Sequence, residues 1–310
     1  MKLQKVKNYL LTGSIHTVMI MTYKKNLDKE ALPEKIKNCI IGKIESNKGK
    51  SYIKLNPNKL HGDLFTFSEF QEAMKEITGK DGLNLTSYYF RRVDFRLDNY
   101  DPGFYEEYWK LNNCLILITM VTYKSRNRIK TEDPLTFDKK TMAFKNTDFE
   151  MEYYNRNIKN KATGNTTEPA KARLEIRMLA HRAPFGWTMD DLKDAFTVEA
   201  IGRLTKSVKN YESLQKKMND SLQKKFLEDQ KQPKNLRVYY SISDFVTKHR
   251  ENFYQTSQLE EFLSRFPELI ENPKRRAYKL STGKIETISK TNLEDIVSKI
   301  RKNMKAFFSE

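Results

Sequence analysis

The sequence contains few cysteines, and this limits the kinds of fold it can have. Only Cys39 and Cys114 occur among the 310 residues, and they lie far apart with no Cys-x-x-Cys pattern. Small secreted domains that depend on disulfides are rich in cysteine. The two cysteines therefore indicate a reducing compartment and argue against a disulfide framework.

Long hydrophobic runs are also missing. The longest apolar run, residues 114–121, is much shorter than the roughly 20 residues that a helix needs to cross a bilayer. The first residues are not followed by the long apolar stretch of a signal peptide. We therefore expect a cytoplasmic protein with no membrane segment.

Histidine is scarce, and the common nucleotide-binding and hydrolase motifs are absent. The four histidines form no His-x-His or His-x-x-x-His pair. A histidine-based metal site is therefore not expected, although His181 follows closely after a polar strand described below. The chain has no P-loop, no G-x-G-x-x-G and no G-x-S-x-G motif, which argues against a nucleotide-driven enzyme or a serine hydrolase.

What the sequence has in excess is positive charge. It contains 57 Lys and Arg against 40 Asp and Glu, so its formal net charge is +17. Such an excess suits a polyanionic partner, most often nucleic acid, and the alternative explanation is a lysine-rich proteome. The C-terminal part is the more basic per residue, which favours contact with duplex DNA there.

Residues 91–98 alternate strictly between charged and apolar side chains, which is the period-2 pattern of a half-buried strand. The charged side carries two acids and two arginines: Arg92, Asp94, Arg96 and Asp98. Residues 173–177 (R-L-E-I-R) repeat the arrangement, with Arg173, Glu175 and Arg177 on the polar side. We expect these two strands to lie side by side.

Carboxylates on the open face of a sheet can hold Mg²⁺ or Mn²⁺, hard cations that take oxygen ligands and polarise a phosphodiester. Asp94 and Glu175 lie mid-strand and are the predicted metal ligands, whereas Asp98 at the strand end is a weaker candidate. Four neighbouring arginines are predicted to bind DNA phosphates: Arg92, Arg96, Arg173 and Arg177. The alternative is an exposed sheet face with cross-strand Arg–carboxylate pairs and no metal.

Metal-assisted strand cleavage followed by rejoining needs a nucleophile, and a tyrosine can serve. Tyr211 lies on the apolar stripe of the long helix predicted after R-L-E-I-R, and this helix could aim the phenol at the metal. An ordinary core tyrosine is the alternative. Tyr153 and Tyr154 are competing candidates, because Tyr154 shares a predicted strand face with Glu150 and Glu152.

The remaining patterns predict an α+β fold with a largely antiparallel central sheet and helices on one face. Predicted strands cover residues 17–23, 51–55, 88–97, 115–123, 149–156 and 173–177, with a hairpin at 275–288. Predicted helices cover residues 66–78, 104–111, a long stretch from 188, and 243–249, 257–266 and 292–307. Ser68 with Gln71 fits a capping box for the first of these helices. We divide the chain into a catalytic domain, residues 1–228, and a C-terminal DNA-binding helical region, residues 236–310.

Three motifs in order resemble the replication-initiation-factor family, which comprises the Rep initiators of rolling-circle plasmids and related relaxases of integrative conjugative elements. They are R-V-D-F-R-L-D (92–98), Y-Y-N-R (153–156) and R-L-E-I-R (173–177). The match spans about residues 50–220. Asn155 stands where the family has an acid.

The resemblance implies a nickase that cuts one DNA strand at an origin with a catalytic tyrosine and stays attached to the 5′ phosphate. It implies Asp94 and Glu175 as ligands of a divalent cation, and Tyr211 as the nucleophile by order and spacing. The partners it implies are origin DNA, a second copy of the chain and a helicase. A conjugative relaxase with the same chemistry and a non-catalytic DNA-binding regulator are the two alternative functions.

Overall fold

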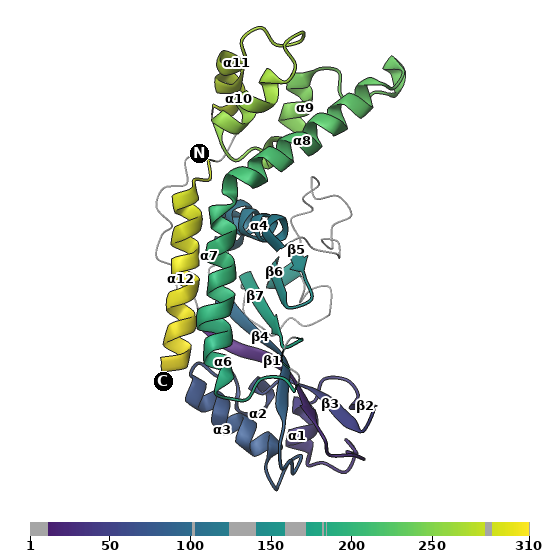
Figure 1. The fold of residues 1–310 in the computed structure, drawn as a ribbon, viewed down its shortest axis with the longest axis vertical. Coiled ribbons are helices and arrows are strands. Elements are labelled where there is room, and N and C mark those ends of the chain that lie inside the picture. Colours follow the sequence, from purple (N-terminus) through teal and green to yellow (C-terminus); the bar gives the residue numbers. More distant parts are fainter. Residues whose placement is uncertain are drawn as a thin grey trace.

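An antiparallel seven-stranded sheet forms the centre of the fold (Figure 1). The computed structural model describes residues 12–100, 103–123, 141–158, 172–181, 183, 185–282 and 287–309. The strands are β1 (Thr12–Thr22), β2 (Glu45–Asn47), β3 (Lys50–Leu55), β4 (Tyr89–Asn99), β5 (Thr141–Lys145), β6 (Phe149–Asn155) and β7 (Ala172–Leu179). Their order is β2-β3-β1-β4-β7-β6-β5, with β4 and β7 at the centre. The predicted α+β class with an antiparallel sheet is confirmed.

Helices lie between the strands along the chain, and after β7 the described residues form only helices and their connections. The first group is α1 (Glu34–Cys39), α2 (Asn58–His61), α3 (Phe67–Thr78) and α4 (Phe104–Tyr123). The second group is α6 (Asp191–Asp194), the π-helical turn η1 (Ala195–Ala200), α7 (Ile201–Lys209) and α8 (Tyr211–Gln230). The third group is η2 (Lys234–Leu236), α9 (Ile242–Lys248), η3 (Arg250–Asn252), α10 (Thr256–Ser264), α11 (Pro273–Ser281) and α12 (Lys290–Ser309).

The apolar face of the sheet carries the core. The ring of Phe95 on β4 lies 5.5 Å from Phe196 of η1 and 5.4 Å from Phe307 of α12. On β6, the ring of Tyr153 stacks on Tyr105 of α4 at 5.3 Å. These contacts follow from the alternation in the strands, which places every second side chain on the side that the helices cover.

Two predictions of strand structure are wrong. Residues 115–123, predicted as a strand, form the second half of α4, whose residues 108–119 are all buried. A helix buried on all sides shows no amphipathic period, so a short apolar run does not distinguish it from a central strand. The hairpin predicted at residues 275–288 is replaced by α11, where Asn272 accepts a hydrogen bond from the Arg275 amide at 2.9 Å and Pro273 opens the helix. Residues 283–286 of that segment lie outside the described residues.

Two local details also differ from the predictions. The capping box of α3 is made by Thr66 and Glu69, not by Ser68 and Gln71, so the helix begins two residues earlier than the predicted cap allows. Strand β5 was not predicted, because its five residues lie in a mostly polar stretch with little periodicity.

The C-terminal helices leave the sheet and then come back to it. Helix α8 leads to α9, α10 and α11, which lie together at the top of Figure 1, and α12 then runs back along α7. At its end, the ring of Phe308 lies 4.9 Å from Phe67 of α3. The predicted division near residues 228–236 stays a prediction, but the last helix of the second region packs on the sheet. Within the described parts of the chain, no helix is long and apolar enough to span a bilayer.

Candidate functional site

The two motif strands are neighbours, as predicted from their patterns. β4 and β7 pair in antiparallel register, with Asp94 opposite Arg177 and Arg96 opposite Glu175. β6, which carries the third motif, pairs with the other edge of β7, and Tyr154 lies opposite Arg173. Their polar side chains form one surface, here called the polar sheet face: Arg92, Asp94, Arg96, Asp98, Glu150, Glu152, Tyr154, Arg173, Glu175 and Arg177.

Arg177 is the centre of the polar sheet face. Its Nη2 donates to Glu175 Oε2 at 2.5 Å and to Glu152 Oε2 at 2.6 Å. Its Nη1 donates to Glu150 Oε2 at 3.3 Å, and its Nε lies 3.6 Å from Asp94 Oδ2. One guanidinium therefore neutralises parts of four carboxylates that come from three strands.

The other arginines have their own carboxylate partners. Arg92 holds both oxygens of Asp94, with Nε and Nη2 each at 2.7 Å. Arg173 holds both oxygens of Asp98 at 2.6 and 2.8 Å, and both residues are only 1% exposed. Asp98 therefore forms an interior ion pair. Arg173 and Asp98 stabilise the sheet only together, because removing one of them leaves the other charge buried without its bidentate partner.

The guanidinium of Arg96 is bound by side chains of this chain. Its Nε donates to Ser14 Oγ at 2.8 Å, and its Nη2 donates to Asp63, which lies in the segment after α2. Arg96 thus ties the segment after α2 to the sheet. Among the four predicted phosphate-binding arginines, the side chains of Arg92 and Arg177 are the more exposed, at 22% and 16%.

Tyr154 is the tyrosine of the polar sheet face. Its hydroxyl donates to Glu175 Oε1 at 2.6 Å, and Tyr154 is 1% exposed. Burial and the nearby negative charge of Glu175 raise the pKa of the Tyr154 phenol. Burial alone would raise the pKa of Glu175 too, but Arg177 and Arg173 outweigh it and hold that pKa well below its usual range. The pair is thus a neutral phenol bonded to an ionised carboxylate.

Three other predicted site residues lie away from the polar sheet face. Tyr211 begins α8 on the helix-covered side of the sheet, where its hydroxyl donates to the Ile288 carbonyl at 2.5 Å. Tyr153 points to the same side and packs on helix α4. His181 is exposed beyond the end of β7 and makes no hydrogen bond or ion pair with a described residue. The structure therefore brings Asp94, Glu175 and Tyr154 together, but does not bring Tyr211 to them.

As folded, the carboxylates do not fit a divalent cation. Both oxygens of Asp94 are held by Arg92, and the two oxygens of Glu175 are held by Tyr154 and Arg177. No group of three or more His, Cys, Asp or Glu side chains among the described residues is arranged to hold a metal ion. The predicted Mg²⁺ or Mn²⁺ stays a prediction.

One residue near this face was not identified from sequence. His16 lies at a β-bulge in β1, where the register with β4 shifts between Ile15 and Thr17. Burial lowers the pKa of His16 to about 3, helped by the positive charges of Arg173 and Arg96. The imidazole is therefore neutral at physiological pH. No sequence signal marks His16, because the bulge arises from strand pairing and not from a local motif.

Comparisons with known proteins give a similarity in structure but no family. No protein-family model matches the chain. No curated protein matches it either. The chain is similar in structure to a rolling circle replication initiator protein from Geobacillus stearothermophilus, at 13% identity and a TM-score of 0.31, covering 56% of this chain and 76% of that chain.

Proposed function

We propose that the chain binds DNA and cuts one strand by tyrosine transesterification, in the manner of a rolling-circle plasmid initiator. The observation that supports this most is the meeting of three separate sequence motifs on one face, where Tyr154 bonds to Glu175 beside Arg177. A phenol, a carboxylate and guanidinium groups are the parts needed to attack a phosphodiester, accept the phenol proton and bind phosphate.

The proposed nucleophile is Tyr154 and not Tyr211. The phenol oxygen of Tyr154 forms a bond to the scissile phosphorus while its proton passes to Glu175. The bond from phosphorus to the 3′ oxygen breaks, and that oxygen leaves with the electron pair and takes the proton to become a free 3′-OH. One phosphodiester replaces another, so the step needs no external energy source and can be reversed.

The face has to open before this chemistry is possible. Tyr154 is 1% exposed, and the proton transfer is uphill while arginines keep Glu175 a weak base. A DNA phosphate that takes over Arg177 and Arg92 removes positive charge from the carboxylates and restores the basicity of Glu175. DNA binding therefore both exposes and activates the pair in this proposal.

Duplex binding is assigned to the C-terminal helical region, as its charge predicts. Four basic side chains lie exposed along the first two turns of α11: Lys274, Arg275, Arg276 and Lys279. Lysine and arginine on an exposed helix contact DNA phosphates, and the affinity then falls as the salt concentration rises. A second copy of the chain and a helicase stay predicted partners.

A denaturing gel that detects a covalent protein–DNA adduct tests the proposal. Single-stranded and supercoiled origin DNA are incubated with the protein in Mg²⁺, in Mn²⁺ and in chelator, which also measures the metal requirement. We expect the adduct with wild type and Tyr211→Phe, and none with Tyr154→Phe. An adduct that persists in Tyr154→Phe and disappears in a folded Tyr211→Phe would return the assignment to Tyr211.

One observation favours a second candidate, a DNA-binding regulator without catalysis. Every acid of the polar sheet face has an arginine partner, as expected of a purely structural ion network. This candidate predicts DNA binding and no adduct under any of the three ionic conditions. A conjugative relaxase would give the adduct at a transfer origin instead of a replication origin.

A further inference from the structure

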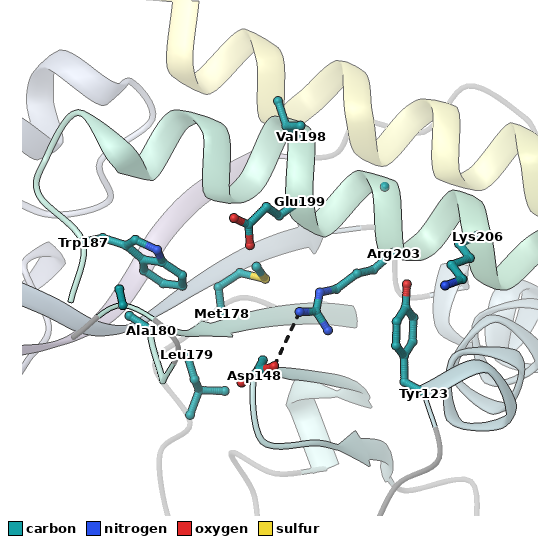
Figure 2. Close-up of a pocket in the computed structure, with 12 residues that line it drawn as sticks. Tyr123, Asp148, Met178, Leu179, Ala180, Trp187, Val198, Glu199, Arg203 and Lys206 are labelled. Atoms are coloured by element: carbon teal, nitrogen blue, oxygen red, sulfur yellow. Dashed lines mark ion pairs between the residues drawn. The ribbon is translucent and has the colours of Figure 1, made fainter. Parts of the chain in front are cut away.

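A cavity of about 600 Å³ opens between the end of β7 and the helical segment formed by η1 and α7 (Figure 2). None of its lining residues belongs to the polar sheet face. Its volume lies in the range of small-molecule sites. The neighbouring turn η1 is π-helical, a geometry that occurs often at functional sites.

One end of the cavity is cationic. The guanidinium of Arg203 lies 5.3 Å from the ring centre of Tyr123 and 5.7 Å from that of Phe149, so two aromatic rings fix its position. Its ion pair with Asp148 is long, at 3.8 Å, and it donates no hydrogen bond to a described residue. Its planar set of N–H donors is therefore available to a bound anion. Lys206, one turn further along α7, lies 5.8 Å from the Tyr123 ring centre and adds a second positive charge.

The other end is apolar and aromatic. Figure 2 shows the indole of Trp187 and the side chain of Met178 on this side, with Glu199 above them and Arg203 toward the opposite end. Trp187 is half-buried, so part of its ring faces the open space. An indole face binds flat aromatic groups by stacking. The carboxylate of Glu199 on this side, and that of Asp148 beside Arg203, can accept hydrogen bonds from hydroxyl or amino groups.

These features share one ligand chemistry. A flat aromatic group against Trp187, an anion on Arg203 and Lys206, and donors toward Glu199 describe a nucleotide: a base, a phosphate, and sugar hydroxyl or base amino groups. We propose that this cavity is a nucleotide-binding site, separate from the polar sheet face. The site takes either a free nucleoside phosphate or one nucleotide of a single strand, and it does not depend on the nicking activity.

Gly202 makes a selective test possible. It lines the cavity, and a Cβ added to it would meet nothing within 4 Å. Gly202→Leu therefore fills the open space without removing a contact, and it replaces a poor helix former with a good one. Gly202→Ala, with one added methyl group, is the mild version. Lys209→Gln removes a charge from the same helix outside the cavity and serves as the matched control for Arg203→Met.

The experiment is isothermal titration calorimetry of the full chain with two probes, deoxyadenosine 5′-monophosphate and a single-stranded deoxyadenosine pentanucleotide. We expect at least one probe to bind to wild type, Gly202→Ala and Lys209→Gln, with no measurable binding to Gly202→Leu. Arg203→Met should weaken binding by about tenfold or more, as loss of a charge-assisted phosphate contact does. Deoxyadenosine without phosphate should bind as weakly to wild type as the nucleotide binds to Arg203→Met.

The two probes also identify the source of the ligand. If the mononucleotide binds and Gly202→Leu abolishes this binding, the ligand is a free nucleotide. If only the pentanucleotide binds, the ligand is one nucleotide of a single strand. If neither probe binds at millimolar concentration, or if Gly202→Leu binds as wild type does, the proposal is wrong. Thermal unfolding of each variant confirms that a loss of binding is not a loss of fold, and Gly202→Leu is expected to unfold no earlier than wild type.

Discussion

The Tyr154 hydroxyl donates a 2.6 Å hydrogen bond to Oε1 of Glu175, across the pair of strands β6 and β7. This contact joins two of the three motifs that the sequence singled out. It also places a potential nucleophile on a potential proton acceptor, in a face where arginines supply the opposing charge.

Removing the charge of Glu175 should stop the chemistry and leave the fold intact. Glu175→Gln keeps the shape but accepts no proton, so adduct formation should fall by about 10²–10⁴-fold. The fold should persist because Arg177 keeps its contacts with Glu150, Glu152 and Asp94. Quench-time gels of adduct formation measure the rate. Glu150→Gln is the matched control, because it also removes a charged partner of Arg177 but leaves the hydrogen bond between Tyr154 and Glu175 in place. This variant should retain most of the rate of adduct formation.

The buried pair of Arg173 and Asp98 should be essential for stability as a pair. Arg173→Met leaves the Asp98 charge in a fully buried position and should cost about 3–5 kcal/mol of unfolding free energy. Adding Asp98→Leu to the same chain should restore much of that loss, because the buried carboxylate that lost its bidentate partner is then removed as well. Urea unfolding of the two variants measures the difference. Arg92→Met, at a more exposed position, should cost less unfolding free energy. An Arg173→Met protein as stable as wild type would contradict this account.

Stability should decrease as the pH falls below neutral, in part through His16. Its folded-state pKa of about 3 lies below the ordinary value of 6.5, so the unfolded chain binds a proton that the folded chain excludes. The stability contribution is therefore present above pH 6.5 and is lost as the pH falls toward 3. Between pH 7 and pH 4.5 we expect a loss of about 1–2 kcal/mol, allowing for its partial exposure.

The comparison with His16→Gln isolates this contribution. The charges that act on the imidazole are Arg173 and Arg96, which disfavour protonation, and Glu175 and Asp98, which favour it. Urea unfolding at several pH values should show a smaller slope for the variant than for wild type in this window. Parallel curves for the two proteins would mean that His16 is not excluded from protonation in the folded state.

The end of α12 should be part of the core of the sheet. Phe308 is 4% exposed, and its ring lies 4.9 Å from Phe67 and 6.0 Å from Phe196. Phe308→Ala should therefore cost about 3–5 kcal/mol. Phe185→Ala is the matched control, because Phe185 is 54% exposed and its loss should cost much less. Equal unfolding midpoints for the two variants would show that α12 is not required for the sheet.

The strands of the polar sheet face could be predicted because their information is local. Alternation over residues 91–98 and 173–177 marks which side chains share a face, and an apolar face on each strand requires burial against the same core. The neighbouring position of β4 and β7 followed from that pattern and is confirmed. By contrast, α4 was misassigned over residues 115–123, because its buried and largely apolar run at 115–119 has the same pattern as a buried strand.

The sequence by itself determined the residue types of the proposed site, the basic character of the chain and the α+β class. Only the tertiary structure decided which tyrosine meets the carboxylates. Tyr211 and Tyr154 are both buried, but strand pairing brings Tyr154 to Glu175, whereas the start of α8 directs Tyr211 to a backbone carbonyl on the helix side. The physical reason is that a face of a sheet is assembled from distant segments by hydrogen-bond register, which no single segment encodes.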